Sequence, residues 1–370
     1  MTTIKKISTY LLGQDQIFVK IDTSEPGLFG WGSVAFAGHH KLIAISVNDY
    51  LTDFLIGKEI TEIEDIWQTS QVQSSWRNDP ALNCALSAID QALWDIKGKE
   101  VGKSVVDLIG GRARKAVPVL MKCEKNLNSG LLDEIARLQN DEIEYFLINP
   151  EMDSKAVTYG RQIVEVFSKL RSEFGNKVHL AHDFDGRLSP TEALAVVKRL
   201  EEFHPFFLED VFPPEHIDWH LAMRMQTKVP MATGKRFVNP HEWLNIIPQM
   251  AIDILRCNIS AIGGLSQALK VGHYAAPISI RTSWSAGELQ SPIESVATGH
   301  LSLNLLNAGP QEWRQPSSVI TDVVGGLPEM KNGYLYFNAK PGFGLEISEQ
   351  NLTLLNNLPI NRKITHYDNH

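Results

Sequence analysis

The chain has 370 residues, of which 43% are hydrophobic and 21% are charged, and its formal net charge is −8. This composition is typical of a globular protein with a substantial core, and the acidic balance argues against nucleic acid and anionic membrane surfaces as partners. No apolar run approaches the roughly 20 residues of a membrane-spanning helix, and the N-terminal MTTIKKISTY lacks the apolar segment of a secretory signal. We therefore expect a cytoplasmic protein, in which Cys84, Cys123 and Cys257 are buried thiols.

The first 115 residues have the pattern of an α+β domain. The run QIFVKIDTSEPGLFGWGSV (16–34) predicts two β-strands joined by a Pro-Gly turn, within an antiparallel meander that a helix follows before residue 60. Residues 60–100 are predicted to be helical. Their apolar side chains recur with the spacing of a buried helix face, at Leu82, Leu86, Ile89, Leu93 and Ile96.

From residue 117 onward, short apolar runs alternate with amphipathic helical stretches. The eight runs lie at 117–123, 144–150, 178–185, 205–211, 229–235, 253–260, 277–283 and 309–313. Strands that are apolar throughout are typical of a parallel sheet covered on both faces, and regular βα alternation indicates a (β/α)₈-type barrel. Residues 321–370 lack this alternation, and we expect a hairpin and a tail that return to the N-terminal part.

Charged residues end three consecutive predicted strands. The third strand ends in Asp183 and Asp185, the fourth in Glu209 and Asp210, and the fifth in Lys235 and Arg236. From Asp183 to Glu209 and from Glu209 to Lys235 the step is 26 residues, one βα unit each time. Because barrel active sites lie where the strands end, we expect these side chains to converge, with the Lys235 ammonium in salt-bridge range of at least one carboxylate.

The later strands also end in polar or aromatic side chains. Arg256 lies on the sixth strand, Trp284 and Ser285 follow the seventh, and Glu312 lies on the eighth. Carboxylates that face each other from adjacent strands repel unless a positive charge lies between them. A hard divalent cation or a lysine ammonium would each supply that charge.

Several motifs give the chain a resemblance to a known family. They are EITEIEDIWQ, ALSAIDQALWDIKGK, DLIGG, FFLEDVFPPE, IGGLSQALKV, SPIESVATGHL, QEW and LPINR. Over nearly its whole length the chain resembles the enolase superfamily, and within it the mannonate dehydratase subgroup of acid-sugar dehydratases. The resemblance implies a modified TIM barrel, (β/α)₇β, over residues 116–320. It also implies an α+β capping domain over 1–115 and a C-terminal segment, 321–370, that returns to the cap.

The same resemblance implies a reaction. In the subgroup, the ends of strands three, four and five each give a carboxylate to one Mg²⁺, which holds the carboxylate of an acid sugar such as D-mannonate or D-gluconate. A base removes the neighbouring proton, and an acid helps the β-hydroxyl to leave. The implied cofactor is Mg²⁺, the implied partner is a small carboxylate or acid-sugar ligand, and the implied assembly is a homo-oligomer.

The match to the subgroup's functional positions is partial. Asp183 and Glu209 fall on the first two metal-ligand positions, and Lys235 stands where the third metal carboxylate is expected. The two catalytic histidines of the subgroup are replaced by Asp185 and Ser285. Substitutions also fall on an aspartate of the strand-seven loop and on a sugar-contacting asparagine of the cap, at Leu289 and Ala37.

The remaining matched positions are predicted to contact substrate. Arg256 falls on the strand-six arginine and Glu312 on the strand-eight glutamate. Ser285 and Trp284 lie beside them, although Trp284 could equally pack beneath the cap. With Mg²⁺, three carboxylates leave one negative charge, and two carboxylates with a lysine leave the same charge. Lys235 therefore indicates a pocket that is balanced without a metal, because Mg²⁺ needs oxygen ligands and an ammonium repels it.

The sequence leaves three functions open. The chain could be an active Mg²⁺-dependent dehydratase, or a metal-free acid-sugar enzyme with Lys235 as electrophile and Asp185 as base. It could also be a relative with little or no dehydratase activity that binds a small anion or serves as an interaction or regulatory protein. The combined loss of a metal ligand and both histidines favours the third function, because each missing group is worth on the order of 10²–10⁴ in rate.

Overall fold

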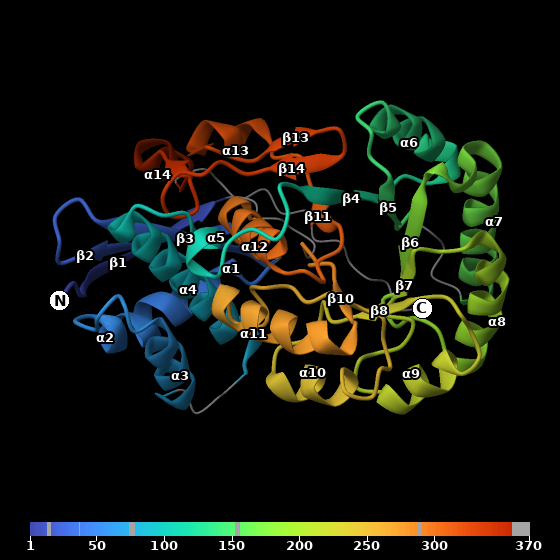
Figure 1. Cartoon of the computed structure of the whole chain (residues 1–370), viewed down its shortest axis with the longest axis horizontal. Helices are drawn as coiled ribbons and strands as arrows, with labels where there is room; N and C mark the ends of the chain where they lie inside the picture. The colour runs from blue at the N-terminus through green and yellow to red at the C-terminus, as the bar shows by residue number, and fades with distance from the viewer. Residues whose placement is uncertain (13–15, 37, 74–77, 152–155, 287–290, 357–370) are drawn as a thin grey trace.

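The computed structural model describes residues 1–12, 16–36, 38–73, 78–151, 156–286 and 291–356. Figure 1 shows a cap at the left, a barrel at the right, and C-terminal elements across the top. Ala37, Leu289 and the LPINR motif lie outside the described residues, so the predictions made for them are not addressed by the structure.

The cap is built on the predicted three-stranded meander. Its antiparallel strands, in the order β1-β2-β3, are β1 (Ile4–Leu12), β2 (Gln16–Thr23) and β3 (Phe29–Ala35). Its helices are α1 (His40–Ile45), a π-helical turn (Ser46–Leu51), α2 (Thr52–Leu55), α3 (Ile63–Gln73), α4 (Pro80–Val101) and α5 (Val105–Leu108). Helix α4 packs directly on β3, where a Cβ added to Gly32 would lie 1.9 Å from the carbonyl oxygen of Ala88. Glycine is therefore required at this close approach.

The start of α4 follows from its sequence. The Asp79 side chain accepts hydrogen bonds from the backbone N–H groups of Ala81 and Leu82, both at 2.9 Å, and Pro80 occupies the first helical position. An aspartate cap followed by proline is a strong helix-start signal. Gly102 ends the helix with φ 66°, a left-handed conformation that glycine adopts without strain.

All eight predicted barrel strands are present and parallel. They are β4 (Val117–Cys123), β5 (Tyr145–Ile148), β6 (His179–Asp183), β7 (Phe207–Glu209), β8 (Met231–Thr233), β9 (Ile254–Leu255), β10 (Arg281–Thr282) and β11 (Gln311–Trp313). They pair in chain order from β4 to β10. Strand β11 pairs with β4, and a parallel bridge between Thr282 and Ala308 joins β10 to the segment before β11. The sheet is thereby closed, which confirms the predicted barrel.

Seven helices alternate with these strands in the described part of the chain. They are α6 (Leu131–Gln139), α7 (Ala156–Phe174), α8 (Pro190–Leu200), α9 (Ile217–Arg224), α10 (Pro240–Ile246), α11 (Leu265–Ala275) and α12 (Pro292–Asn304). In the described residues β11 leads into α13 (Ser318–Val323) of the C-terminal segment, so the barrel proper has eight strands and seven helices, the predicted (β/α)₇β arrangement. The seventh predicted strand, 277–283, is shorter than expected, because Ala276–Ile278 form a 3₁₀ turn around Pro277. Proline lacks the N–H that a central strand needs.

Helix α12 links the barrel to the cap through one buried histidine. The Nδ1 atom of His300 accepts a hydrogen bond from the Val106 backbone N–H of α5 at 3.1 Å. The imidazole also packs edge-on against Phe337 and Phe343 of the C-terminal segment. Burial lowers the pKa of His300 to about 3, so the ring is neutral near pH 7.

The C-terminal segment contains the predicted hairpin and contacts the cap again. Its elements are α13 (Ser318–Val323), β12 (Val324–Gly325), β13 (Glu329–Lys331), β14 (Tyr334–Tyr336), β15 (Glu346–Ile347) and α14 (Glu349–Asn356). Hairpin strand β14 pairs with β4 of the barrel. At the start of α14, Glu349 forms an ion pair with Lys20 of the cap at 2.8 Å and accepts a hydrogen bond from the Tyr10 hydroxyl.

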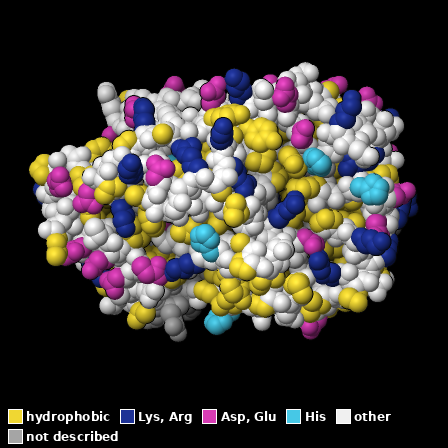
Figure 2. Space-filling view, viewed as in Figure 1, with side chains coloured by type: hydrophobic (Ala, Val, Ile, Leu, Met, Phe, Trp, Pro, Cys, Tyr) yellow, Lys and Arg dark blue, Asp and Glu magenta, His cyan; other side chains and the backbone are white. Residues whose placement is uncertain are grey.

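The described surface carries charges of both signs. Figure 2 shows Lys and Arg side chains interspersed with Asp and Glu across one face of the molecule. Among the described residues, no helix is both long enough and apolar enough to cross a membrane. The three cysteines are buried and unpaired, as predicted.

Candidate functional site

The end of the barrel at which the strands finish carries the charged residues that the sequence singled out. One inner layer of the barrel is apolar and consists of Leu120, Leu147, Ala181, Phe207, Ala232 and Ile254. Because side chains alternate along a strand, the residues two positions further on point the same way. That places Asp183, Glu209 and Arg256 above this apolar layer, at the barrel mouth.

Lys235 lies among carboxylates. Its Nζ forms ion pairs with Asp183, with Asp185 at 3.0 Å and with Asp210 at 3.6 Å. This confirms the prediction that the ammonium lies in salt-bridge range of a strand-end acid. Burial alone would lower the pKa of Lys235, but Asp183, Glu209, Asp210 and Asp185 together raise it above its ordinary value. Lys235 is therefore a permanent cation at the mouth.

Asp210 is a member of the site to which the sequence reasoning gave no role, although it lies at the end of the fourth predicted strand. Strand alternation would point it away from Glu209, but its backbone has φ 43°, which turns the side chain toward Lys235. Its Oδ1 accepts a hydrogen bond from the Thr233 hydroxyl at 2.5 Å. Burial raises the pKa of Asp210 to about 6. The only sequence signal was the pair of consecutive acids at the end of the fourth strand.

Asp185 does not have the surroundings of the predicted base. Burial would raise its pKa, but Lys235, Arg236 and Arg187 together hold it below its ordinary value. Arg236 contacts its Oδ1, and Arg187 lies 3.5 Å from its Oδ2. A carboxylate stabilised by three cations is a weak proton acceptor. Asp185 and its three cations form one charged group with Asp183 and Asp210, which also pair with Lys235. We call this group the Lys235 cluster; its members are Lys235, Arg236, Arg187, Asp183, Asp185 and Asp210.

Arg256 lies between two buried glutamates and is shielded from solvent. Its Nε donates to Glu209 at 3.0 Å and its Nη2 donates to Glu312 at 2.8 Å. Its Nη1 donates to the Ser283 carbonyl at 3.0 Å, and the side chain is only 1% exposed. The structure therefore gives Arg256 and Glu312 a mutual ion pair, and their predicted contact with substrate stays a prediction. Burial raises the pKa of Glu209, which Arg256 opposes, and among the described residues Glu209 Oε1 has no hydrogen-bond partner.

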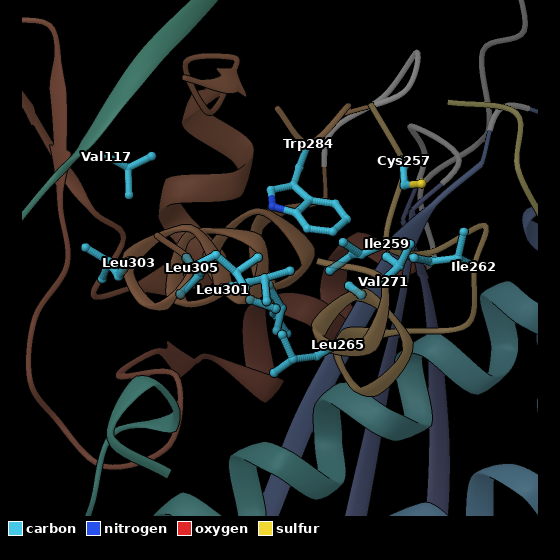
Figure 3. Packing of buried hydrophobic residues seen from close by; sticks show 14 of the residues in the cluster. Val117, Cys257, Ile259, Ile262, Leu265, Val271, Trp284, Leu301, Leu303 and Leu305 are labelled. Carbon is cyan, nitrogen blue, oxygen red and sulfur yellow. The ribbon is translucent and has the colours of Figure 1, made fainter. Parts of the chain in front are cut away.

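Ser285 lies beside the Arg256 ion pair, whereas its neighbour Trp284 lies in the hydrophobic core. The Ser285 hydroxyl lies 3.5 Å from Glu312 Oε2, at the edge of the Arg256 ion pair. Trp284 is 1% exposed and belongs to the main hydrophobic cluster. Figure 3 shows its ring directed into the packing among Leu301, Leu305 and Ile259. Trp284 is thus a core residue, as in the second of its two predicted roles, and it also lines a small cavity together with Ser285 and Glu312.

The residues at the mouth do not fit Mg²⁺. An ammonium occupies the centre of the Lys235 cluster, and Glu209 is tied to Arg256. Mg²⁺ requires near-octahedral oxygen coordination at about 2.0–2.1 Å, which a cation among the carboxylates prevents. In the part of the chain that the structure describes, no group of three or more His, Cys, Asp or Glu side chains is arranged to hold a metal ion.

Barrel, cap and strand-end acids together define the class of protein. Residues 6–110 match the mandelate racemase/muconate lactonizing enzyme N-terminal domain, and residues 148–351 match the enolase C-terminal domain-like family. The chain belongs to the enolase superfamily, and within it to a group of acid-sugar dehydratases, the D-galactonate dehydratase family.

Two curated relatives and one solved structure illustrate the membership. The chain is 36% identical to D-galactonate dehydratase family member RspA of Pantoea ananatis (strain LMG 20103), over 94% of this chain and 92% of the relative. It is also 36% identical to a D-galactonate dehydratase family member of Enterococcus gallinarum (strain EG2), over 94% and 91%. A crystal structure of an enolase from Pantoea ananatis with bound D-gluconate and Mg matches with a TM-score of 0.92 and 34% identity, over 96% of this chain and 94% of that one.

Proposed function

We propose that this chain binds a small acid-sugar carboxylate without Mg²⁺ and has little or no dehydratase activity. The observation that carries the proposal is the Lys235 ammonium, which lies among the carboxylates where the family resemblance expects a divalent cation. The solved relative with bound D-gluconate and Mg supports an acid sugar as the ligand class. At the barrel mouth the ligand would therefore encounter the Lys235 ammonium in place of a bound Mg²⁺.

Loss of the proton-transfer groups supports the second half of the proposal. Dehydration needs a base beside the carboxylate and an acid at the departing hydroxyl. Asp185 is neutralised by three cations, and Ser285 offers only a hydroxyl beside Glu312. A missing acid or base costs on the order of 10²–10⁴ in rate. Two such losses together would lower turnover by about 10⁴–10⁸.

A metal-free enzyme is the second candidate, and one observation favours it. Lys235 is permanently charged and could stabilise an enolate as an electrophile, while burial raises the pKa of the neighbouring Asp210 to about 6, a suitable value for a base. Such an enzyme would exchange the C2 proton of an acid sugar with solvent. Incubation with D-gluconate in D₂O, followed by proton NMR, separates the two: binding alone leaves the C2 signal unchanged.

Calorimetry and turnover assays test the main proposal. The purified chain should bind no Mg²⁺ stoichiometrically at low millimolar concentration. It should also not dehydrate D-gluconate, D-mannonate or D-galactonate. One tightly bound Mg²⁺ per chain would contradict the metal-free site. Turnover of about 1–10³ s⁻¹ on any of these acids would show that the chain is an active dehydratase.

A further inference from the structure

Two arginines lie on the solvent side of the Lys235 cluster. Arg187 follows β6 and Arg236 follows β8, and their side chains are 47% and 45% exposed. They approach the Asp185 carboxylate at its two oxygens, because Arg236 contacts Oδ1 and Arg187 Nη2 lies 3.5 Å from Oδ2. Lys235 is only 18% exposed and already pairs with three carboxylates. An anion that enters from solvent is therefore more accessible to Arg187 and Arg236 than to the ammonium.

The loop that carries Arg187 is held in place by its own contacts. The backbone N–H of Arg187 donates to the Phe184 carbonyl at 3.2 Å, and that of Gly186 donates to the Asp210 carbonyl at 2.8 Å. The Arg187 guanidinium also lies 5.8 Å from the centre of the Tyr159 ring, within the range of a cation–π contact. Because the loop is fixed and one face of the guanidinium is packed, binding a ligand costs less conformational entropy.

The two guanidiniums have more hydrogen-bond donors than Asp185 can accept. Each guanidinium carries five N–H donors, and one carboxylate offers about four acceptor positions. Asp185 Oδ1 already accepts from Lys235 Nζ at 3.0 Å and from Arg236 Nη2, which also lies 3.3 Å from the Asp185 carbonyl oxygen. Within the described parts of the chain, Asp185 is the one acid that forms an ion pair with either arginine. Most of the N–H donors of Arg187 and Arg236 are therefore available to a second carboxylate.

We propose that Arg187 and Arg236 form the subsite for the carboxylate of the ligand. The inference rests on the proposed function and deepens it, because it assigns the charged end of the acid sugar to the ends of β6 and β8. Guanidinium groups bind carboxylates through paired, charge-assisted hydrogen bonds. The ligand carboxylate binds on the solvent side of Asp185, and the hydroxyl groups of the sugar extend from there over the barrel mouth.

Calorimetric titration of the full-length chain with D-gluconate tests the subsite. Arg187→Met and Arg236→Met should each weaken binding by about tenfold to a hundredfold, since each removes a charged hydrogen-bond donor. Arg236→Lys should weaken binding less than Arg236→Met, because an ammonium keeps the charge but loses the planar fork. Arg199→Met is the matched control and should leave the affinity unchanged, since Arg199 is exposed in the last turn of α8, at the end of that helix away from the mouth. Circular dichroism of each variant checks that it is folded.

Asp185→Asn distinguishes a binding subsite from ion pairs that only hold the loop. It removes the carboxylate that competes for both arginines, so D-gluconate should bind more tightly than to the wild type, and weaker binding would contradict the subsite. If the wild type binds D-gluconate and both arginine-to-methionine variants bind it equally well, the subsite is wrong and the proposed function stands. If the wild type binds none of D-gluconate, D-mannonate and D-galactonate, both proposals fail. Higher salt should weaken D-gluconate binding in the wild type, because Arg187 and Arg236 are partly exposed.

Discussion

Replacing Lys235 with glutamate should convert the mouth into a Mg²⁺ site. In Lys235→Glu the ammonium that pairs with Asp183, Asp185 and Asp210 is lost, and a further carboxylate takes its place. Asp183, the unpartnered Oε1 of Glu209 and the new glutamate then supply three oxygen ligands. Without a cation these carboxylates repel one another, so the variant should be less stable than the wild type until Mg²⁺ is added.

The size of the effect follows from the burial of the ion pairs. Removing one partner of a buried ion pair costs about 3–5 kcal/mol in the free energy of unfolding, and the Lys235 side chain is only 18% exposed. For 370 residues, about 2.1 cal/mol/K per residue gives an unfolding entropy of about 0.8 kcal/mol/K, so Tm should fall by about 4–6 °C. Mg²⁺ at a hundred times its Kd should restore about 2.7 kcal/mol, or about 3–4 °C.

Thermal unfolding of three proteins with and without Mg²⁺ makes the measurement. Lys235→Met is the matched control, because it loses the ammonium without gaining a ligand. It should be destabilised and should not respond to Mg²⁺. The wild type should be insensitive to Mg²⁺, and Lys235→Glu should show no dehydratase activity even with Mg²⁺, since neither proton-transfer group is restored. Equal responses to Mg²⁺ in the wild type and in Lys235→Glu would refute the idea that Lys235 takes the place of the metal.

Two further predictions concern stability. Arg256→Met leaves Glu209 and Glu312 buried without their shared cation, so urea unfolding should show a loss of about 3–5 kcal/mol, and a loss below about 1 kcal/mol would mean that the ion pairs do not matter. His300 has a pKa of about 3 in the folded state and about 6.5 in the unfolded state. Between these two pH values the unfolded state binds more protons, so the free energy of unfolding decreases as pH falls from 6.5 toward 3. The greatest loss is about 5 kcal/mol, from 1.36 kcal/mol per pKa unit. His300→Asn should flatten the free energy of unfolding between pH 6.5 and 4, and an unchanged pH profile would show that another group governs it.

The barrel could be predicted from the sequence because its strands are buried on both faces and read as uninterrupted apolar runs. The approach of Lys235 to Asp183 was predictable for a related reason, since equal βα steps bring strand ends together. The short β10 was not predictable in length, because a 3₁₀ turn at Pro277 replaces its first half. Apolar runs and βα spacing therefore predict which strands form and which strand ends meet, but they do not predict where a local turn shortens a strand.

The roles of individual side chains at the mouth were harder to predict. The Asp210 side chain turns toward Lys235 because its backbone has a positive φ. Glycine is the usual sequence signal for a positive φ, and this position has an aspartate instead. The partners of Arg256 depend on side chains brought from β7 and β11, far apart in the chain. The ring of Trp284 could face either side of its strand end, and only the packing of α11 and α12 decides which. Such contacts are set by three-dimensional packing and leave little trace in a single sequence.

A crystal structure of the wild-type chain grown with Mg²⁺ and D-gluconate tests the central claim most directly. We predict that the Lys235 ammonium stays between Asp183 and Asp210 and that no Mg²⁺ is bound there. Mg²⁺ coordinated by Asp183 and Glu209, with Lys235 turned away from them, would contradict the account.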